Sequence, residues 1–180
     1  MEPRFQTNRL TLRLFEPSDA LLVQALAGSE EVARTTLSIP HPYPDGAAEA
    51  WIERTRNASK DGDIFSFAMV KKEGEMLIGC VSLRVSKSEN QAELGYWVGR
   101  PFWGQGYATE AAHKIVEFGF EGLGLDHIFA AAMTKNPASY KVMQKIGMKP
   151  EDNLPKQILK SGMYEDLVHY GMVKSEIIND

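Results

Sequence analysis

The residues with the clearest capacity for chemistry lie between Ala92 and Ala112. Within this stretch, residues 99–106 include three glycines and one proline. They separate the alternating apolar residues of 92–98 from a helical pattern that begins at Tyr107. Backbone N–H groups at the start of a helix can bind phosphate oxygens when no side chain obstructs them. The pattern therefore predicts either a phosphate site or a tight strand-to-helix connection without a ligand.

Two common phosphate-binding motifs do not fit this loop. A P-loop has Lys and then Ser or Thr after its last glycine, whereas Gly106 is followed by Tyr107 and Ala108. A dinucleotide-binding fingerprint needs a third small residue at the position of Thr109, and it normally lies near the start of a domain. Neither motif therefore accounts for the loop.

The segment from Trp103 to Ala108 resembles the pyrophosphate loop of the GNAT superfamily of N-acetyltransferases, written Arg/Gln-x-x-Gly-x-Gly/Ala. Gly106 and Ala108 match this pattern, and Trp103 departs from its first position. The longer string from Glu93 to Ala111 is similar to the branch that contains the ribosomal-protein alanine and serine N-acetyltransferases. The resemblance implies that acetyl-CoA is the co-substrate. It also implies a set of coenzyme-binding residues, namely Trp97, Val98, Trp103, Gly104, Gln105, Gly106, Tyr107, Ala108, Thr109, Asn136 and Ser139.

Ser139 is the first candidate for a catalytic residue. It shares the apolar face of a predicted helix, 136–146, with Val142 and Met143. A serine in that position either bonds back to its own helix or has a function. The stretch from Asn136 to Ser139 resembles a family segment, Asn-x-x-Ser, and the resemblance implies that the asparagine contacts the pantetheine arm and the serine protonates the leaving thiolate. Many family members carry a catalytic tyrosine at the position of Met143, and methionine cannot transfer a proton.

Glu93 is the second catalytic candidate. The alternation of its strand places it on the same face as Gly95 and Trp97, opposite Leu94, Tyr96 and Val98. A carboxylate beside an aromatic surface can have its pKa raised toward that of a useful base, although Glu93 equally fits a solvent position at the start of the strand. Residues 154–157 lack the late glutamate that the better-known ribosomal enzymes of this branch use, so the general base stays open. The resemblance also implies that an N–H near Val98 polarises the thioester carbonyl.

The elements that must position these residues follow from periodicity and from helix and turn signals. We expect helices at 17–27, 30–35, 47–60, 107–121 and 137–146, with Asn136 as the cap of the last one, and strands at 9–15, 64–71, 76–86, 91–98, 127–134, from Met148 onward and at 167–173. Short turns predict that the strands from 64 to 98 form an antiparallel meander, and the crossover helix places 127–134 parallel to 91–98. The sequence thus predicts an α/β (α+β) fold with the GNAT order of elements. Its mixed, mostly antiparallel sheet of about seven strands is flanked by helices and splays between 91–98 and 127–134. We expect a single N-acetyltransferase domain, 1–180, with its core at about 8–174.

Composition narrows the class of protein. The chain has 180 residues, a formal charge of −4 and no basic run, which argues against nucleic acid as a partner. No apolar run is long enough to span a bilayer, and the N-terminus lacks the apolar core of a signal peptide, so we expect a cytoplasmic enzyme without a membrane partner. The single cysteine, Cys80, fits a core residue better than a nucleophile. The four histidines are scattered, which predicts no metal site.

The expected activity is transfer of an acetyl group from acetyl-CoA to a primary amine by direct attack on the thioester. A protein or peptide N-terminal α-amine is favoured, because deprotonating it at pH 7 costs about 1 kcal/mol against about 4.6 kcal/mol for a lysine. The alternatives are a small-molecule acceptor (a polyamine, an antibiotic or a metabolite), a non-catalytic acyl-CoA sensor, and a nucleotide-binding enzyme. Substrate contacts are expected from residues 40–44 and 154–163, in a monomer or a homodimer.

Overall fold

The computed structural model describes residues 1–177 and contains one mixed sheet flanked by helices. The strands are β1 (Arg4–Gln6), β2 (Leu10–Leu14), β3 (Ile64–Lys71), β4 (Leu77–Ser86), β5 (Gln91–Val98), β6 (His127–Met133), β7 (Lys149–Glu151), β8 (Gln157–Lys160) and β9 (Met163–Val173). The α-helices are α1 (Ala20–Ala27), α2 (Glu30–Thr35), α3 (Ala47–Asp61), α4 (Tyr107–Glu117), α5 (Pro137–Lys145) and α6 (Lys174–Ile177).

The strands lie in the order β1-β2-β3-β4-β5-β6-β9-β7, and β8 pairs with β9. The predicted meander is confirmed, because β3, β4 and β5 pair antiparallel in sequence. The predicted parallel pair is confirmed as well, since β6 runs alongside β5 in the same direction. Within residues 1–177 the sheet has nine strands rather than about seven. The two extra ones, β1 and β8, have three and four residues, too few for a periodic pattern to show.

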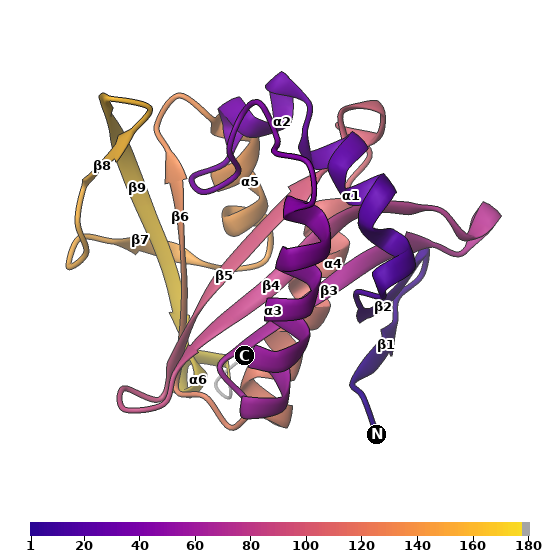
Figure 1. Ribbon diagram of the computed structural model, residues 1–180. Helices are drawn as coiled ribbons and strands as arrows, with labels where there is room; N and C mark the ends of the chain where they lie inside the picture. The colour runs from indigo at the N-terminus through magenta and orange to yellow at the C-terminus, as the bar shows by residue number, and fades with distance from the viewer. Residues whose placement is uncertain (178–180) are drawn as a thin grey trace.

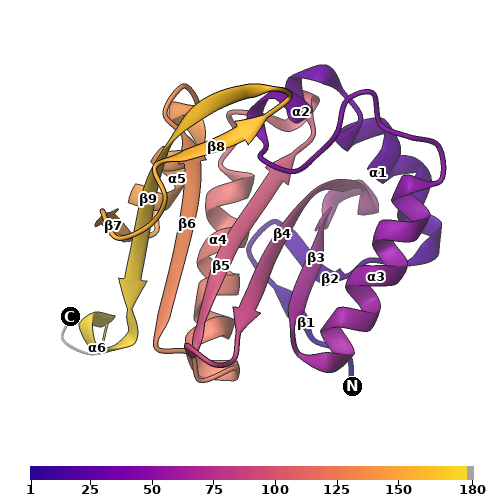
Figure 2. The same cartoon turned by 60° about the vertical axis from the view of Figure 1, so that its left-hand side comes forward.

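Helices cover both faces of the sheet (Figures 1 and 2). On one face α1 and α3 contact β3 and β4, and on the other face α4 contacts β4 and β5. The alternation along β3 divides its side chains between two cores: Phe65, Phe67 and Met69 join the α4 side, whereas Ala68 and Val70 join the α3 side. Among residues 1–177, no helix has the length and apolarity that crossing a membrane requires.

The parallel pair β5 and β6 is the place where the sheet opens. Pairing between these strands covers only three residues, from Gln91↔His127 to Glu93↔Phe129. On its other side, β5 stays paired with β4 as far as Val98↔Gly79. Beyond Glu93 the two strands diverge toward α2 and α5 (Figure 2). The predicted splay is therefore confirmed, and it leaves the second half of β5 with one free edge.

The helix after the glycine-rich loop is shorter than predicted. Residues 107–121 were expected to be continuous helix, but α4 ends at Glu117 and a π-helical turn follows from Phe118 to Gly122. The Phe118 ring packs against Phe5 and Phe65, with centroid distances of 4.9 and 5.4 Å. We attribute the wider turn to this packing, which depends on residues distant in sequence and which a local helical period does not reveal.

Candidate active site

The glycine-rich loop between β5 and α4 is built to approach an anion closely. Gly104 and Gly106 have φ values of 72° and 81°, in the left-handed region that favours glycine. Gly106 is also the N-cap of α4, and no side chain caps the helix. The first backbone bond within α4 runs from the Glu110 N–H to the Gly106 carbonyl, at 3.1 Å. The N–H groups of residues 107–109 therefore lack partners within the helix and suit phosphate oxygens.

An arginine from the start of the chain completes this loop, and sequence reasoning missed it. Arg9 donates from Nη1 to the Gln105 carbonyl at 2.9 Å and from Nε to Glu110 Oε2 at 2.7 Å. Its guanidinium also lies 4.3 Å from the centre of the Tyr107 ring. Burial would raise the pKa of Glu110, but the bonds from Thr7 and Arg9 outweigh it and lower that pKa. The loop is thus fixed by an ion pair between Arg9 and Glu110, with the Arg9 guanidinium beside Gly106.

Trp103 fastens the loop to the end of β5. Its indole Nε1 donates to the Val98 carbonyl at 2.6 Å, and the Arg100 guanidinium lies 4.8 Å from its ring centre. The tryptophan that departs from the family motif therefore has a structural role, and Arg100 brings a second cation to the loop. Trp103 is itself 36% exposed at the surface.

The free edge of β5 presents backbone N–H groups to the gap. The Gly99 N–H donates to the Ile78 carbonyl at 2.8 Å, so the polar groups of Gly99 face β4. Because these groups alternate in direction along an antiparallel strand, the N–H groups of Tyr96 and Val98 face the gap instead. An extended ligand lying in the gap would meet both of them.

Two hydroxyl groups meet inside the gap. The Tyr96 hydroxyl donates to the Ser139 carbonyl at 2.6 Å, and Ser139 Oγ donates to Tyr96 Oη at 3.2 Å. Burial raises the pKa of Tyr96 to about 12, against the opposing effect of its bond with Ser139. Sequence reasoning missed Tyr96, because strand alternation places it on the face opposite Glu93. Met143 brings no hydroxyl group to the site, and the hydroxyl group next to Ser139 comes from Tyr96 on β5.

Asn136 differs from its predicted role as a helix cap. It occupies the N-cap position of α5, but its side chain makes no capping bond. Its Nδ2 donates instead to the Thr35 carbonyl at the end of α2, at 3.1 Å. The asparagine therefore ties α5 to α2 across the open side of the sheet.

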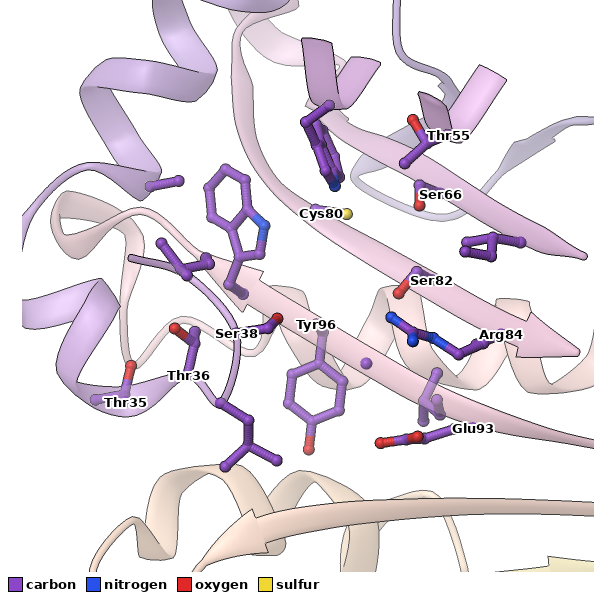
Figure 3. A pocket seen from close by; sticks show the side chains of 18 of the residues that line it. Thr35, Thr36, Ser38, Thr55, Ser66, Cys80, Ser82, Arg84, Glu93 and Tyr96 are labelled. Carbon is purple, nitrogen blue, oxygen red and sulfur yellow. The ribbon is translucent and has the colours of Figure 1, made fainter. Parts of the chain in front are cut away.

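The gap continues into a cavity of about 480 Å³ on the α1 and α3 side of the sheet (Figure 3). Its floor is formed by β3, β4 and β5, its far wall by β6 and α5, and its roof by the segment after α2. Its lining includes Thr35, Thr36, Ser38, Trp51, Thr55, Ser66, Cys80, Ser82, Arg84, Glu93, Gly95, Tyr96, Trp97, Ala131, Met133, Ser139 and Met143. The cavity thus reaches both hydroxyl groups in the gap.

Glu93 lies in this cavity on the predicted strand face. Leu94 is 2% exposed in the α4-side core, whereas Glu93, Gly95 and Trp97 line the cavity on the other face. Among residues 1–177, no hydrogen bond or ion pair involves the Glu93 carboxylate. Its register partner on β4 is Arg84, which also faces the cavity.

The two segments that were expected to contact the substrate, 40–44 and 154–163, lie in different positions relative to the cavity. Pro40 and Tyr43, from the first segment, line the cavity. None of the described lining residues comes from 154–163. Instead Lys160 donates to the Ala33 carbonyl at 2.5 Å and to the carbonyl of Thr36, and burial lowers its pKa. The second segment therefore holds the cavity roof rather than lining the cavity.

The remaining chemistry-bearing side chains do not form a second centre. Cys80 is 3% exposed, and burial raises the pKa of its thiol, so it is held as a protonated core residue. Across residues 1–177, no group of three or more His, Cys, Asp and Glu side chains is arranged to hold a metal ion.

The sequence and fold match known acetyltransferases. A family model described as Acetyltransferase (GNAT) domain matches residues 9–149. The Bacillus licheniformis protein named "Uncharacterized N-acetyltransferase p20" is 31% identical over 172 residues, covering 94% of this chain and 96% of that protein. "Putative ribosomal N-acetyltransferase YdaF" of Bacillus subtilis (strain 168) is 29% identical over 171 residues, covering 93% and 92%.

A solved structure with bound coenzyme shares the fold. It is that of the microcin C7 self-immunity acetyltransferase MccE in complex with acetyl-CoA and AMP. It aligns with a TM-score of 0.81 and 19% identity, over 92% of this chain and 93% of that one. The family match spans β2 to β6, the glycine-rich loop and α5, and so includes both strands that border the gap. The chain therefore belongs to the GNAT family of acetyltransferases and is an N-acetyltransferase.

Proposed function

We propose that the protein moves an acetyl group from acetyl-CoA to a primary amine by direct attack of the amine on the thioester. One observation carries the proposal: β5 and β6 stop pairing after Glu93. The gap that results joins the glycine-rich loop to the cavity and contains the hydroxyl groups of Tyr96 and Ser139. An acyl donor held along β5 and an acceptor held in the cavity would meet there.

The residues of the gap and the loop fit acetyl-CoA. The N–H groups that begin α4 and the Arg9 guanidinium suit a pyrophosphate, and a Cβ atom at Gly104 would meet no atom within 4 Å, so the loop is open. Val98 and Tyr96 present N–H groups to which the amides of the pantetheine arm can bond in the manner of an added strand. Acetyl-CoA supplies the activated acetyl group, and these residues bind and orient it. A Val98 N–H aimed at the thioester oxygen would stabilise the oxyanion.

The Tyr96 phenol has one O–H, which donates to the Ser139 carbonyl in this structure. Turned from that carbonyl toward the gap, it suits the role of a hydrogen-bond donor to the leaving sulfur. With a pKa of about 12 it stays protonated at all working pH values. Complete transfer of its proton to a thiolate, whose thiol has a pKa near ~8.5, would cost about 5 kcal/mol. We therefore propose that Tyr96 stabilises the thiolate. Ser139, whose hydroxyl group bonds to the phenol oxygen, orients the phenol. This division of roles differs from the sequence-based expectation that Ser139 protonates the leaving thiolate.

Glu93 suits the acceptor side of the reaction. Its carboxylate lies on the cavity face at the point where the gap begins, and an ammonium group entering the cavity would bind it. Loss of a proton from the amine, to Glu93 or to water, is cheap for an N-terminal α-amine, at about 1 kcal/mol at pH 7. We propose a protein or peptide N-terminus as the first acceptor class, supported by the relative named as a ribosomal N-acetyltransferase. A small-molecule amine is the second, because a cavity of about 480 Å³ also suits a small ligand.

The test is calorimetric titration with acetyl-CoA, followed by thiol release against a panel of amines. The panel contains N-terminal peptides beginning with Ala, Ser or Met, a polyamine, an aminoglycoside and a lysine peptide. We expect binding and thiol release with at least one α-amine. Binding without release for any amine would favour a sensor, and binding of ATP or NAD in place of acetyl-CoA would overturn the assignment of the loop.

A further inference from the structure

The floor of the cavity carries polar groups that have no partner among residues 1–177. Ser66 and Ser82 are register partners on β3 and β4, and Ser82 is the partner of Gly95 on β5. The next row contains Arg84 and Glu93. Among residues 1–177, none of these four side chains takes part in a hydrogen bond or an ion pair. Unpaired polar groups in a cleft are the groups that bind a polar ligand.

Arg84 and Glu93 carry opposite charges and lie at different distances from the gap. They are directly opposite one another, and the Gly99–Ile78 bond sets the ladder so that their Cα atoms lie about 5.5 Å apart. Glu93 lies on the strand next to the gap, and Arg84 lies one strand further away. In Figure 3 both head groups turn into the same part of the cavity as the Tyr96 ring.

Because Glu93 lies nearer to the gap than Arg84, the two charges determine the orientation of a bound acceptor. Its amine has to point toward the gap, because the acyl group is transferred there. The amine then meets Glu93, and whatever follows it in the acceptor meets Arg84. Arg84 is exposed, so water solvates its guanidinium when the site is empty, and a neutral group at that position would form no ion pair with it. A carboxylate would satisfy it with paired, charge-assisted hydrogen bonds.

We infer that the acceptor carries a carboxylate close to its amine, within about one strand spacing of ~5 Å, and that Arg84 is the residue that selects it. This inference rests on the proposed function and names the acceptor class of the same site. Two sources supply this chemistry: a free amino acid, and a peptide whose first residue is acidic. Arg84 does not touch the reacting atoms, and its effect is on acceptor selection.

The experiment compares acceptors with and without the carboxylate, and the ratio of wild-type to variant rates for each acceptor removes the difference in amine basicity between acid and amide. Thiol release is measured with alanine against alaninamide, and with a peptide amide beginning Asp against the same peptide beginning Asn. We expect the wild-type protein to prefer the acid of at least one pair, and that pair identifies the source. In the Arg84→Gln variant, kcat/KM for that acid should fall by roughly 10- to 150-fold, the range for a hydrogen bond to a charged group. In the same variant, kcat/KM for the amide and KM for acetyl-CoA should stay within about twofold of the wild-type values.

The Arg54→Gln variant separates Arg84 from the second arginine that lines the cavity. If that variant loses the preference and Arg84→Gln keeps it, the assignment to Arg84 is wrong. Equal use of acid and amide by the wild-type protein overturns the inference and leaves the acetyltransferase proposal intact. If no amine yields thiol, the proposed function fails, and calorimetric titration of the four acceptors in the presence of coenzyme A decides the inference. A preference for the acids that Arg84→Gln removes would still support it, and no preference would overturn it.

Discussion

Replacing Tyr96 with phenylalanine tests most directly how the gap between β5 and β6 acts. The change removes one hydroxyl group and keeps the ring that packs against the α4-side core. If the phenol donates to the leaving sulfur, the variant should bind acetyl-CoA as the wild-type protein does and turn over more slowly. The expected loss is in kcat, because the bond strengthens as negative charge develops on the sulfur.

The magnitude follows from the strength of the bond. A hydrogen bond to a charged group contributes about 1.5–3 kcal/mol, so kcat for Tyr96→Phe should fall by roughly 10- to 150-fold. The variant also loses the 2.6 Å bond to the Ser139 carbonyl, which should reduce the free energy of unfolding by about 1 kcal/mol. The protein should therefore remain folded.

The pH dependence gives an independent check. Burial raises the pKa of Tyr96 to about 12, so the phenol is a donor below that pH and loses its proton only above it. The wild-type rate should show no decline from phenol ionisation below pH 10. The Tyr96→Phe variant should have the same profile between pH 6 and 10, displaced to a lower plateau. A wild-type decline near pH 8 that the variant lacks would mean that the phenol ionises during catalysis, contrary to the assigned role.

The assay is thiol release under single-turnover conditions with acetyl-CoA saturating, so that chemistry is measured apart from product release. The matched control is Ser139→Ala, which removes the 3.2 Å bond to the phenol oxygen and leaves the phenol in place. Its loss in kcat should be smaller, about threefold to tenfold, as expected for a neutral hydrogen bond. A wild-type rate in Tyr96→Phe would refute the reasoning, as would a larger loss in Ser139→Ala.

Three further predictions concern the loop and the fold. Gly106→Glu should abolish acetyl-CoA binding in calorimetry, because its carboxylate would occupy the expected phosphate position and because the backbone φ of 81° disfavours a residue with a side chain. Unchanged affinity for acetyl-CoA would contradict the assignment of the loop. Asp19 pairs with Arg13 at 2.7 Å, and although burial raises the pKa of Asp19, the bonds that it accepts lower that pKa on balance. In urea titrations, the contribution of Asp19 to the free energy of unfolding should therefore be complete above about pH 4 and be lost as the pH falls further. An Asp19→Asn variant that is equally destabilised at pH 3 and pH 7 would contradict this. Gly171→Ala should lower Tm by roughly 2–10 °C in calorimetry, because its Cβ would lie 2.0 Å from Glu151 Oε1 and would displace that carboxylate from its 2.7 Å bond with His127 Nε2. An unchanged Tm would show that Glu151 moves without cost.

Local signals in the sequence were sufficient for most elements of the fold. The strand Gln91–Val98 and the short helix Glu30–Thr35 were predicted with the bounds that the structure has. Periods of two and 3.6 residues, helix starts and glycine turns are short-range features, so they are visible without tertiary contacts. The end of α4 at Glu117 was missed, because it depends on packing around Phe118 that involves strands distant in sequence.

The candidate site was predicted only as separate parts. The glycine-rich loop, Glu93 and Ser139 were found because each belongs to a local motif or alternation. Tyr96 was assigned to the opposite face of β5 from Glu93, and that assignment is right for a closed sheet. The loss of pairing with β6 lets side chains from both faces reach one cavity, and no local pattern contains that information.

The sequence by itself determined most of the elements, their order and the glycine-rich loop, since these depend on residues close together in the chain. Tertiary structure alone decided which groups meet: Arg9 beside the loop, Tyr96 against Ser139, and Arg84 opposite Glu93. Arg9 and Gln105 are separated by 96 positions in the chain, and Tyr96 and Ser139 by 43 positions. The physical reason is that strand register and the extent of the splay are set by packing of the whole sheet, which side-chain periodicity within one strand does not encode.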